Sequence, residues 1–171
     1  MDVDEFKIKI MPLKDKLFRI VKRLLNDYET SEDALQEIMI KLWDKRNELE
    51  KHPNLEALVV TITKNYCIDL IRTKKIIPME MNEEILEHHS DNPEIELEKS
   101  EVNNVLNNAI SKLPDIQKLI LQLKDIEGYS YEEIANILDK SVGTIRVTLS
   151  RARNQLRNIL VNKYKFNYEK Y

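Results

Sequence analysis

The sequence has 171 residues, of which 33% are charged and 42% apolar, which suits one ordinary soluble domain or two small ones. Its only glycines, Gly128 and Gly143, are too far apart to form a phosphate-binding loop, a dinucleotide-binding turn or a nucleophile elbow. So little glycine also favours helices over a sheet with tight hairpins. The formal net charge of −3, taken as an average, argues against a nucleic-acid-binding protein.

The sequence carries no signal for export or for membrane insertion. Acidic residues precede any apolar stretch near the N-terminus, which does not fit a signal peptide. The apolar run at residues 57–62 is far shorter than the roughly 18 residues that a membrane helix needs. The single cysteine, Cys67, excludes an internal disulfide and a zinc site made of several thiolates. We therefore expect a cytoplasmic protein.

The charge is distributed unevenly along the chain. Residues 1–78 contain 15 basic and 14 acidic side chains, residues 79–108 contain 1 and 9, and residues 109–171 contain 11 and 7. The acidic middle segment has no aromatic residue and contains Pro93, which is typical of a linker that is disordered or marginally helical. We therefore predict two domains, 1–78 and 109–171, joined by an acidic linker at 79–108.

Apolar periodicity predicts about three helices in the first domain. The first spans residues 4–26, with a kink at Pro12. The second begins at a capping box over residues 30–33, Thr-Ser-Glu-Asp. The third spans residues 55–72 and is apolar over much of its circumference, as expected of the central helix of a bundle.

The second predicted helix has two contrasting faces. An apolar stripe that includes Leu35, Ile38 and Leu42 recurs at helical spacing and is expected to be buried. An isoleucine among polar and acidic residues on the opposite face indicates a surface that contacts a partner. The alternative is a single exposed apolar side chain, which any protein surface can carry. The residues of this outer face are Asp33, Gln36, Glu37 and Ile40.

The second domain has the pattern of a helix-turn-helix. One helix is predicted to begin near Pro114 and to end at Gly128. A capping box at Ser130 opens a short helix, a turn follows at Asp139 and Lys140, and Ser141 can cap a last helix. Two short helices joined by such a turn are typical of a DNA-binding helix-turn-helix.

The last predicted helix has an outward face that suits the major groove of DNA. Between Lys140 and Lys165 there are seven basic residues and no acidic one. Arginine can form two hydrogen bonds with guanine O6 and N7, while threonine and serine reach phosphates or thymine methyl groups. The alternative is a solvated basic face, which the preceding helix-turn-helix pattern disfavours. The outward residues are Thr144, Arg146, Val147, Thr148, Ser150, Arg151, Arg153 and Arg157.

Two sets of motifs match a known family. Residues 110–153 contain EGYSYEEIA, SVGTIR and LSRAR, and this segment resembles region 4 of the sigma-70 family. Residues 31–43, SEDALQEIMIKLW, and residues 57–75, ALVVTITKNYCIDLIRTKK, resemble region 2. Because both sets occur in the order of the family and are separated by a linker, the chain most resembles the extracytoplasmic-function (ECF) sigma factors.

The resemblance implies an all-α fold, in which a region 2 bundle of three or four helices is joined by the acidic linker to a region 4 helix-turn-helix. It implies a non-enzymatic subunit that gives bacterial RNA polymerase its promoter specificity, with no cofactor. The expected partners are promoter DNA, the β′ clamp helices and the β flap of the polymerase core, and an anti-sigma factor.

The resemblance also assigns roles to residues. The outer face of the second helix, with Asp33, Gln36, Glu37 and Ile40, would bind the β′ clamp helices. The loop at residues 47–53 and the following helix would recognise and melt the −10 element. There Asn65 would lie near a flipped base, and Arg72, Lys74 and Lys75 would hold phosphates, whereas Asp69 is expected only to pair with Arg72. The −35 element would be contacted by Thr144, Arg146, Ser150, Arg151, Arg153 and Arg157.

The sequence departs from the family at a few positions. Asp139 and Lys140 occupy a turn that often carries glycine followed by an apolar residue. Because aspartate tolerates the left-handed conformation, we still expect the turn to form. Lys118 stands where arginine is frequent. Val147 and Ser150 stand where other members have base-contacting or phosphate-contacting side chains, so the promoter sequence does not follow from the resemblance.

Three other functions are considered. A dimeric helix-turn-helix regulator acting without polymerase accounts for residues 109–171 but leaves residues 31–43 unused. A helical adaptor is disfavoured by the acid-free basic helix. A metal or thiol active site is disfavoured because its candidate residues match no zinc spacing and its cysteine lies in an apolar helical pattern. Those candidates are His52, His88, His89 and Cys67.

Overall fold

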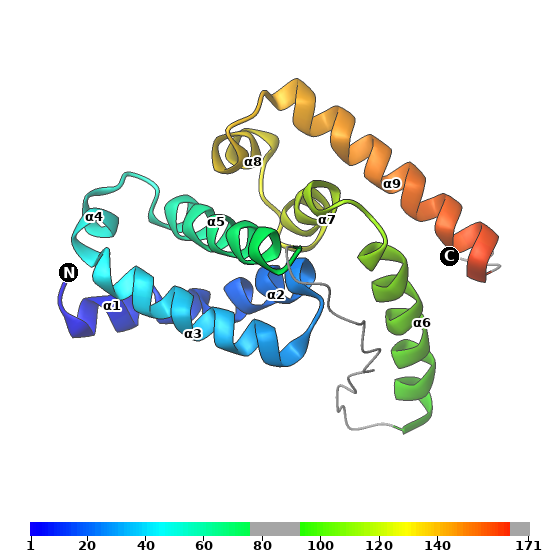
Figure 1. Ribbon diagram of the computed structural model, residues 1–171, viewed down its shortest axis with the longest axis horizontal. Coiled ribbons are helices and arrows are strands. Elements are labelled where there is room, and N and C mark those ends of the chain that lie inside the picture. Colours follow the sequence, from blue (N-terminus) through cyan, green and yellow to red (C-terminus); the bar gives the residue numbers. More distant parts are fainter. Residues whose placement is uncertain (76–92, 165–171) are drawn as a thin grey trace.

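The computed structural model describes residues 1–75 and 93–164, with side chains described for residues 1–73 and 102–162. Every regular element in these ranges is helical (Figure 1). The first half contains α1 (Val3–Lys9), a 3-10 turn η1 (Met11–Leu13), α2 (Lys14–Leu25), α3 (Tyr28–Asp44), α4 (Arg46–Lys51) and α5 (Leu55–Lys75). The second half contains α6 (Pro93–Ser111), α7 (Asp115–Leu121), a π-helical turn η2 (Gln122–Ile126), α8 (Tyr131–Leu138) and α9 (Val142–Tyr164).

The predicted helix over residues 4–26 is interrupted rather than kinked. Pro12 lies at the start of η1, between α1 and α2. A proline ring has no N–H to donate and clashes with the carbonyl of the preceding turn, so α1 ends and α2 begins anew. The apolar residues on both sides of this break still reach one core, because Phe6, Ile10 and Leu17 are all buried.

The capping box predicted at residues 30–33 is wrong. Helix α3 begins earlier, after Asp27, whose carboxylate accepts a hydrogen bond from the backbone N–H of Thr30 at 2.7 Å. The chain turns there because Asn26 takes the left-handed conformation, with φ of 55°. Ser31 therefore lies inside the first turn of α3, where it is buried and its hydroxyl donates to the carbonyl of Asp27.

The segment predicted as a loop at residues 47–53 is mostly helical. It forms α4, and its Leu49 is fully buried against the bundle. Asn54 then starts α5, because its side-chain oxygen accepts a hydrogen bond from the N–H of Ala57 at 3.0 Å. A single apolar residue thus anchors a short helix in this connection.

Helix α2 packs between α3 and α5 and supplies the centre of the first domain (Figure 1). The apolar residues of α2 recur at i, i+3, i+4 and i+7, so they lie on one face of the helix. The core is completed by the predicted inner stripe of α3 and by one side of α5. Its fully or nearly buried members include Leu17, Ile20, Val21, Leu24, Leu35, Ile38, Leu42, Val59, Val60 and Cys67.

The second domain confirms the helix boundaries predicted for the helix-turn-helix. Ser130 forms a capping box with Glu133 at the start of α8. Asp139 ends α8 in the left-handed conformation, with φ of 50° and ψ of 53°. Ser141 accepts the N–H of Thr144 at 3.1 Å at the start of α9. The turn therefore forms without glycine, as expected from the tolerance of aspartate for this conformation.

Helix α6 extends across the predicted boundary between residues 108 and 109. Its last turns carry the buried residues Ala109 and Ile110, and the helix packs against α9. The acidic segment 79–108 thus lies partly outside the described residues and partly in a helix that belongs to the second domain. The division into 1–78, 79–108 and 109–171 stays a prediction.

The two domains are in contact. Helices α2 and α5 lie against α7 and α8, while α9 lies on the far side of α7 (Figure 1). No described helix has an apolar stretch that is long enough to cross a membrane.

Substitution by alanine is expected to change the free energy of unfolding in opposite directions at the two glycines. Gly128 has φ of +77°, and an added Cβ would meet nothing within 4 Å, so its cost is conformational alone. We expect Gly128→Ala to lower the free energy of unfolding by about 1 kcal/mol. Gly143 lies in the first turn of α9, where a Cβ would touch only the Ser141 hydroxyl at 3.9 Å. We expect Gly143→Ala to raise the free energy of unfolding by about 0.5 kcal/mol.

Urea unfolding of both variants, followed by circular dichroism, measures this difference. An equal loss of stability in the two variants would mean that the left-handed backbone at Gly128 is not what requires glycine there.

Candidate nucleic-acid interface

Helix α9 presents a polar, acid-free surface to solvent. Its inner stripe, Ile145, Leu149 and Ala152, is buried against α7 and α8. The predicted DNA-contacting residues near its N-terminus lie on the opposite side, and Val147 among them is 51% exposed. Thr148 is half-buried at the edge of this surface. The exposed residues of this surface are Thr144, Arg146, Val147, Ser150 and Arg151.

Arg146 is held by an aromatic ring that sequence reasoning did not identify. Its guanidinium carbon lies 5.0 Å from the ring centroid of Tyr131, the first residue of α8. The ammonium of Lys124 lies 4.6 Å from the same centroid. A cation over an aromatic face is attracted by the ring quadrupole, so the ring restricts where the guanidinium can point. The sequence gives no signal for this contact, because the two residues are distant in the chain.

Arg153 is paired within its own domain. Its Nε and Nη2 donate to the two carboxylate oxygens of Asp125 in η2, at 3.1 and 2.5 Å. This two-pronged hydrogen bond raises the pKa of Arg153 above its usual value. The predicted phosphate contact of Arg153 therefore competes with Asp125. Arg151, by contrast, forms no hydrogen bond or ion pair with the described residues. Arg157 is exposed one turn beyond Arg153.

Helix α5 exposes the residues predicted to contact the −10 element. Asn65 and Arg72 are both exposed on the helix surface. Arg72 lies 3.9 Å from Asp69 in the expected intrahelical pair, and both side chains are more than 70% exposed. Such a pair contributes little to stability, so the guanidinium can leave Asp69 for a phosphate. Lys74 and Lys75 lie in the last turn of α5, and their side chains are outside the described residues.

The outer face of α3 is exposed to solvent. Asp33, Gln36 and Glu37 are exposed, and Ile40 is 55% exposed among them. The apolar inner stripe of α3 is buried, as predicted from the periodicity. The structure thus keeps a polar and acidic patch with one large apolar side chain on the outside of the first domain.

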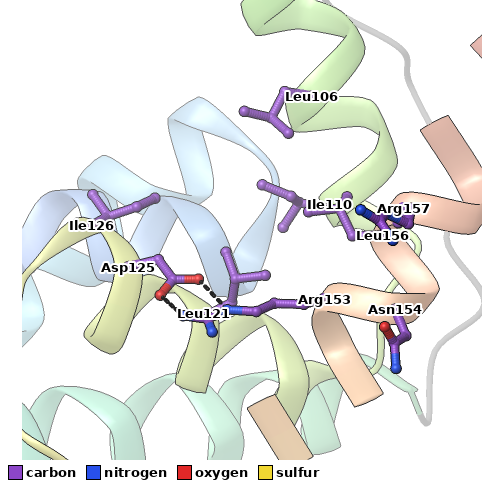
Figure 2. A pocket seen from close by; sticks show the side chains of 9 residues that line it. All are labelled: Leu106, Ile110, Leu121, Asp125, Ile126, Arg153, Asn154, Leu156 and Arg157. Carbon is purple, nitrogen blue, oxygen red and sulfur yellow. Dashed lines mark hydrogen bonds and ion pairs between the residues drawn. The ribbon is translucent and has the colours of Figure 1, made fainter. Parts of the chain in front are cut away.

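The second domain has a groove bounded by four elements, α6, α7, η2 and α9 (Figure 2). Leu106 and Ile110 come from α6, Leu121 from α7, and Leu156 from α9. The cavity measures about 480 Å³, and the ion-paired Asp125 and Arg153 are among its lining residues (Figure 2). Ile126, another of its lining residues, is 47% exposed. The groove lies along the C-terminal half of α9, and two of the predicted DNA-contacting residues, Arg153 and Arg157, are among its lining residues.

The residues considered for metal or thiol chemistry do not form a site in the described part of the chain. No cluster of three metal-ligating side chains occurs there. Cys67 is fully buried in α5, and burial raises the pKa of its thiol to about 12. Such a thiol is a poor nucleophile at neutral pH. His88 and His89 lie outside the described residues.

The predicted surfaces lie on three separate helices, α3, α5 and α9, and do not converge on one cleft. An enzyme needs its reacting groups together, whereas a protein that binds extended partners can use separate faces. This arrangement fits the second kind of protein.

Comparisons with known proteins identify the family of the chain. Residues 10–76 match the family model for sigma-70 region 2, and residues 104–156 match the model for sigma-70 region 4. The structure also superposes on the sigma factor RpoE, solved with the anti-sigma factor NepR, from Bartonella quintana. That match has a TM-score of 0.76 at 24% identity and covers 94% of this chain and 99% of the other.

Two curated relatives extend over most of the chain. The ECF sigma factor SigE of Mycolicibacterium smegmatis is 33% identical over 85% of this chain, which spans 58% of that protein. The ECF sigma factor SigW of Bacillus subtilis is 30% identical over 93% of this chain and 90% of its own. A helix-turn-helix regulator acting without polymerase would not explain the match over residues 10–76. The chain belongs to the sigma-70 family, as an ECF sigma factor that directs RNA polymerase in transcription initiation.

Proposed function

We propose that this sigma factor divides its work among the three exposed surfaces: α3 binds the polymerase core, α5 recognises the −10 element, and α9 recognises the −35 element. The observation that carries this proposal is the outward surface of α9, which is basic, free of acid and opened by a capped N-terminus next to α8. Helices in this position enter the major groove with their N-terminal residues.

Helix α3 suits a protein partner better than DNA. Asp33 and Glu37 lie one helical turn apart and would repel phosphates. Their charge attracts a basic surface, and Ile40 supplies an apolar contact on the same face. A helical pair with basic side chains, such as the β′ clamp helices of the polymerase, satisfies both requirements.

Helix α5 combines an amide with positive charge. The Asn65 side chain offers both a donor and an acceptor, which a flipped base requires on its Watson–Crick edge. Arg72 lies two turns further along the helix, followed by Lys74 and Lys75. We assign these three cations to the backbone phosphates of the melted strand.

On α9, we assign base contacts to Arg146 and Arg151. The hydroxyls of Thr144 and Ser150 can reach the phosphate backbone of the DNA, and Val147 can contact a thymine methyl group. Arg157 contacts a phosphate in this assignment. Arg153 contributes by position, because its pair with Asp125 holds α9 against η2 unless a phosphate displaces the carboxylate.

The groove of Figure 2 is our candidate site for the β flap of the polymerase. It is lined mainly by apolar side chains, and it lies toward the C-terminal half of α9. A helix of the core enzyme can occupy it while the N-terminal half of α9 contacts DNA. By analogy with the complex of the Bartonella protein, we also propose an anti-sigma factor as a partner. We propose a cytoplasmic location as well, because a sigma factor acts together with RNA polymerase.

The central test is transcription with core polymerase that lacks other sigma factors. Sequencing of transcripts after overexpression identifies candidate promoters, and run-off transcription on these fragments follows. We expect specific transcripts only when the protein is added, and co-elution of the protein with core on a sizing column. The absence of both co-elution and initiation on every enriched promoter would refute the proposal.

Charge reversal on α3 tests the polymerase-binding surface. We expect Asp33→Lys combined with Glu37→Lys to weaken core binding by at least about tenfold, because two favourable charge contacts become repulsive. Titration of the fluorescently labelled chain with core polymerase measures the affinity. The matched control is Asp4→Lys combined with Asp15→Lys, which makes the same charge change at exposed positions on α1 and α2. Equal losses in both variants would show that only net charge matters.

Replacing an outward arginine of α9 by alanine should affect promoter recognition and not core binding. We expect Arg146→Ala or Arg151→Ala to lower holoenzyme affinity for the promoter by about tenfold, the scale for one lost two-pronged base contact. Asn158→Ala, at an exposed position on the same helix, is the control. Promoter binding is measured by filter retention and core affinity by titration. A loss of core affinity in the arginine variants would mean that the surfaces are wrongly assigned.

The Tyr131 ring should matter through Arg146. We expect Tyr131→Leu to reduce discrimination at the base pair contacted by Arg146 about two- to fivefold, because a cation–π contact of roughly 0.5–1 kcal/mol is lost. Tyr131→Phe keeps the ring and should preserve discrimination. Competition between promoter variants in the holoenzyme measures this, and equal behaviour of the two substitutions would argue against the positioning role.

A further inference from the structure

Arg153 lies where the groove of the second domain meets the DNA-facing side of α9. It lines the groove together with Asn154 and Arg157 (Figure 2), and its own side chain is 53% exposed. Tyr131, whose ring holds Arg146 on the DNA-facing surface, also contributes to the raised pKa of Arg153, so its phenol lies near this guanidinium. One side chain is therefore within reach of both the groove and the promoter.

Asp125 is the partner that holds Arg153 at the groove. The two side chains form a fork of two hydrogen bonds, from Nε at 3.1 Å and from Nη2 at 2.5 Å. The backbone of Asp125 is fixed, because η2 contains the fully buried Leu123 and is closed by the N–H of Glu127, which donates to the carbonyl of Gln122 at 3.0 Å. The short Asp125 side chain therefore stays in place, and the long stem of Arg153 is the part that can move.

The carboxylate of Asp125 depends on a cation. Its side chain is only 32% exposed, and it is the single acid among the described residues that line the groove. Removing one partner of a partly buried ion pair is unfavourable, because the remaining charge is poorly solvated. When a promoter phosphate takes Arg153, Asp125 is left in the groove without those two hydrogen bonds.

A cation supplied from within the groove replaces the lost contact. The other walls of the groove are mainly apolar, so they suit an amphipathic helix that packs its apolar face on them. A lysine or arginine at the edge of that face can pair with Asp125. This adds a chemical requirement to the β flap helix assigned to the groove above, namely a basic side chain that faces Asp125. The apolar lining residues are Leu106, Ile110, Leu121, Ile126 and Leu156.

We propose that Asp125 couples the groove to the −35 contact by an exchange of cations. In the free chain, Arg153 occupies Asp125. In the initiating complex, Arg153 binds a promoter phosphate, and a basic side chain of the polymerase helix in the groove binds Asp125. Occupation of the groove and contact with the −35 element then favour each other, because a coupling between two sites acts equally in both directions. The proposal rests on the groove and phosphate contacts assigned above.

The affinity of the full chain for core polymerase, measured with and without a short DNA duplex, tests the exchange. The duplex carries the −35 element of a promoter enriched in the transcription experiment and ends before the −10 element. We expect a saturating amount of duplex to raise the affinity for core by about fivefold or more, which is the usual range for coupled sites. Core polymerase that lacks the β flap helix should show no such rise.

Neutralising the acid should break the coupling. We expect Asp125→Asn to abolish the rise in core affinity that the duplex causes, because its amide has no charge to pair with the incoming cation. The matched control is Glu132→Gln, which neutralises an exposed acid on α8 of the same domain and should keep the rise. Circular dichroism and thermal unfolding of each variant establish that it folds.

Removing the internal cation distinguishes an exchange from a purely structural pair. Arg153→Gln keeps most of the stem and frees Asp125 without DNA. We expect it to bind core, in the absence of duplex, as tightly as the unmodified chain does in its presence, and to gain nothing more from the duplex. The double variant with Asp125→Asn should lose this gain, because the gain acts through the carboxylate. A pair that only stabilises the fold predicts weaker core binding in Arg153→Gln.

Two results would overturn the exchange: a rise that survives Asp125→Asn, and a core affinity that falls in a folded Arg153→Gln variant. Binding of both core and duplex by the unmodified chain without any rise would refute the exchange alone. Failure of the unmodified chain to bind core or duplex would refute the proposed function, and the exchange with it.

Discussion

The ion pair between Arg19 and Glu127 joins helix α2 of the first domain to the segment that follows η2 in the second. Burial alone would raise the pKa of Glu127, but hydrogen bonds from Arg19 and Gln122 hold it below its usual value. A carboxyl whose pKa is lowered by folding stabilises the folded arrangement at pH values above its normal pKa, and this contribution is lost as the pH falls through the lowered value. The pair is therefore fully charged near neutrality. Helix α2 supplies Arg19 on one side and the core of the first domain on the other.

The uneven distribution of charge along the chain explains why its net charge is misleading. The acidic segment at residues 79–108 masks a second domain with an excess of basic residues, and that excess is concentrated on α9. Within the first domain, acids lie on the outer face of α3 and cations on α2 and the end of α5. Separate faces of opposite sign suit a protein that must hold a polymerase and contact DNA at once.

Much of the fold was predictable because local signals and tertiary packing agree. The capping boxes, the apolar periodicity and the turn at Asp139 all act within a few residues, so α7, α8 and α9 were placed correctly. The predicted start of α3 failed because Thr-Ser-Glu-Asp matches a capping box as well as Asp27 does. Only the left-handed Asn26, whose conformation depends on how α2 meets α3, decides between them.

The residues of the binding surfaces could also be predicted only in part. Exposure of Asp33, Glu37 and Arg146 followed from helical periodicity, because a residue opposite a buried stripe faces solvent. The partners of the arginines did not follow. Tyr131 beneath Arg146, Asp125 beside Arg153 and Glu127 opposite Arg19 are brought there by helix packing and by the π-helical turn. A sequence that shows which cations are exposed does not show which are already paired.

Pairing decides what an exposed cation can do. Arg153 and Arg19 look equivalent to Arg151 in the sequence, yet each must first leave a carboxylate before it can bind a phosphate. Substitutions of Lys16, Arg19 or Arg23 on α2 should therefore leave the affinity of each isolated surface unchanged while altering the contact between the two domains. Substitutions on α9 or α3 should do the reverse. The fold separates recognition, on α3, α5 and α9, from the coupling of recognition events, on α2 and η2, so the two can vary independently.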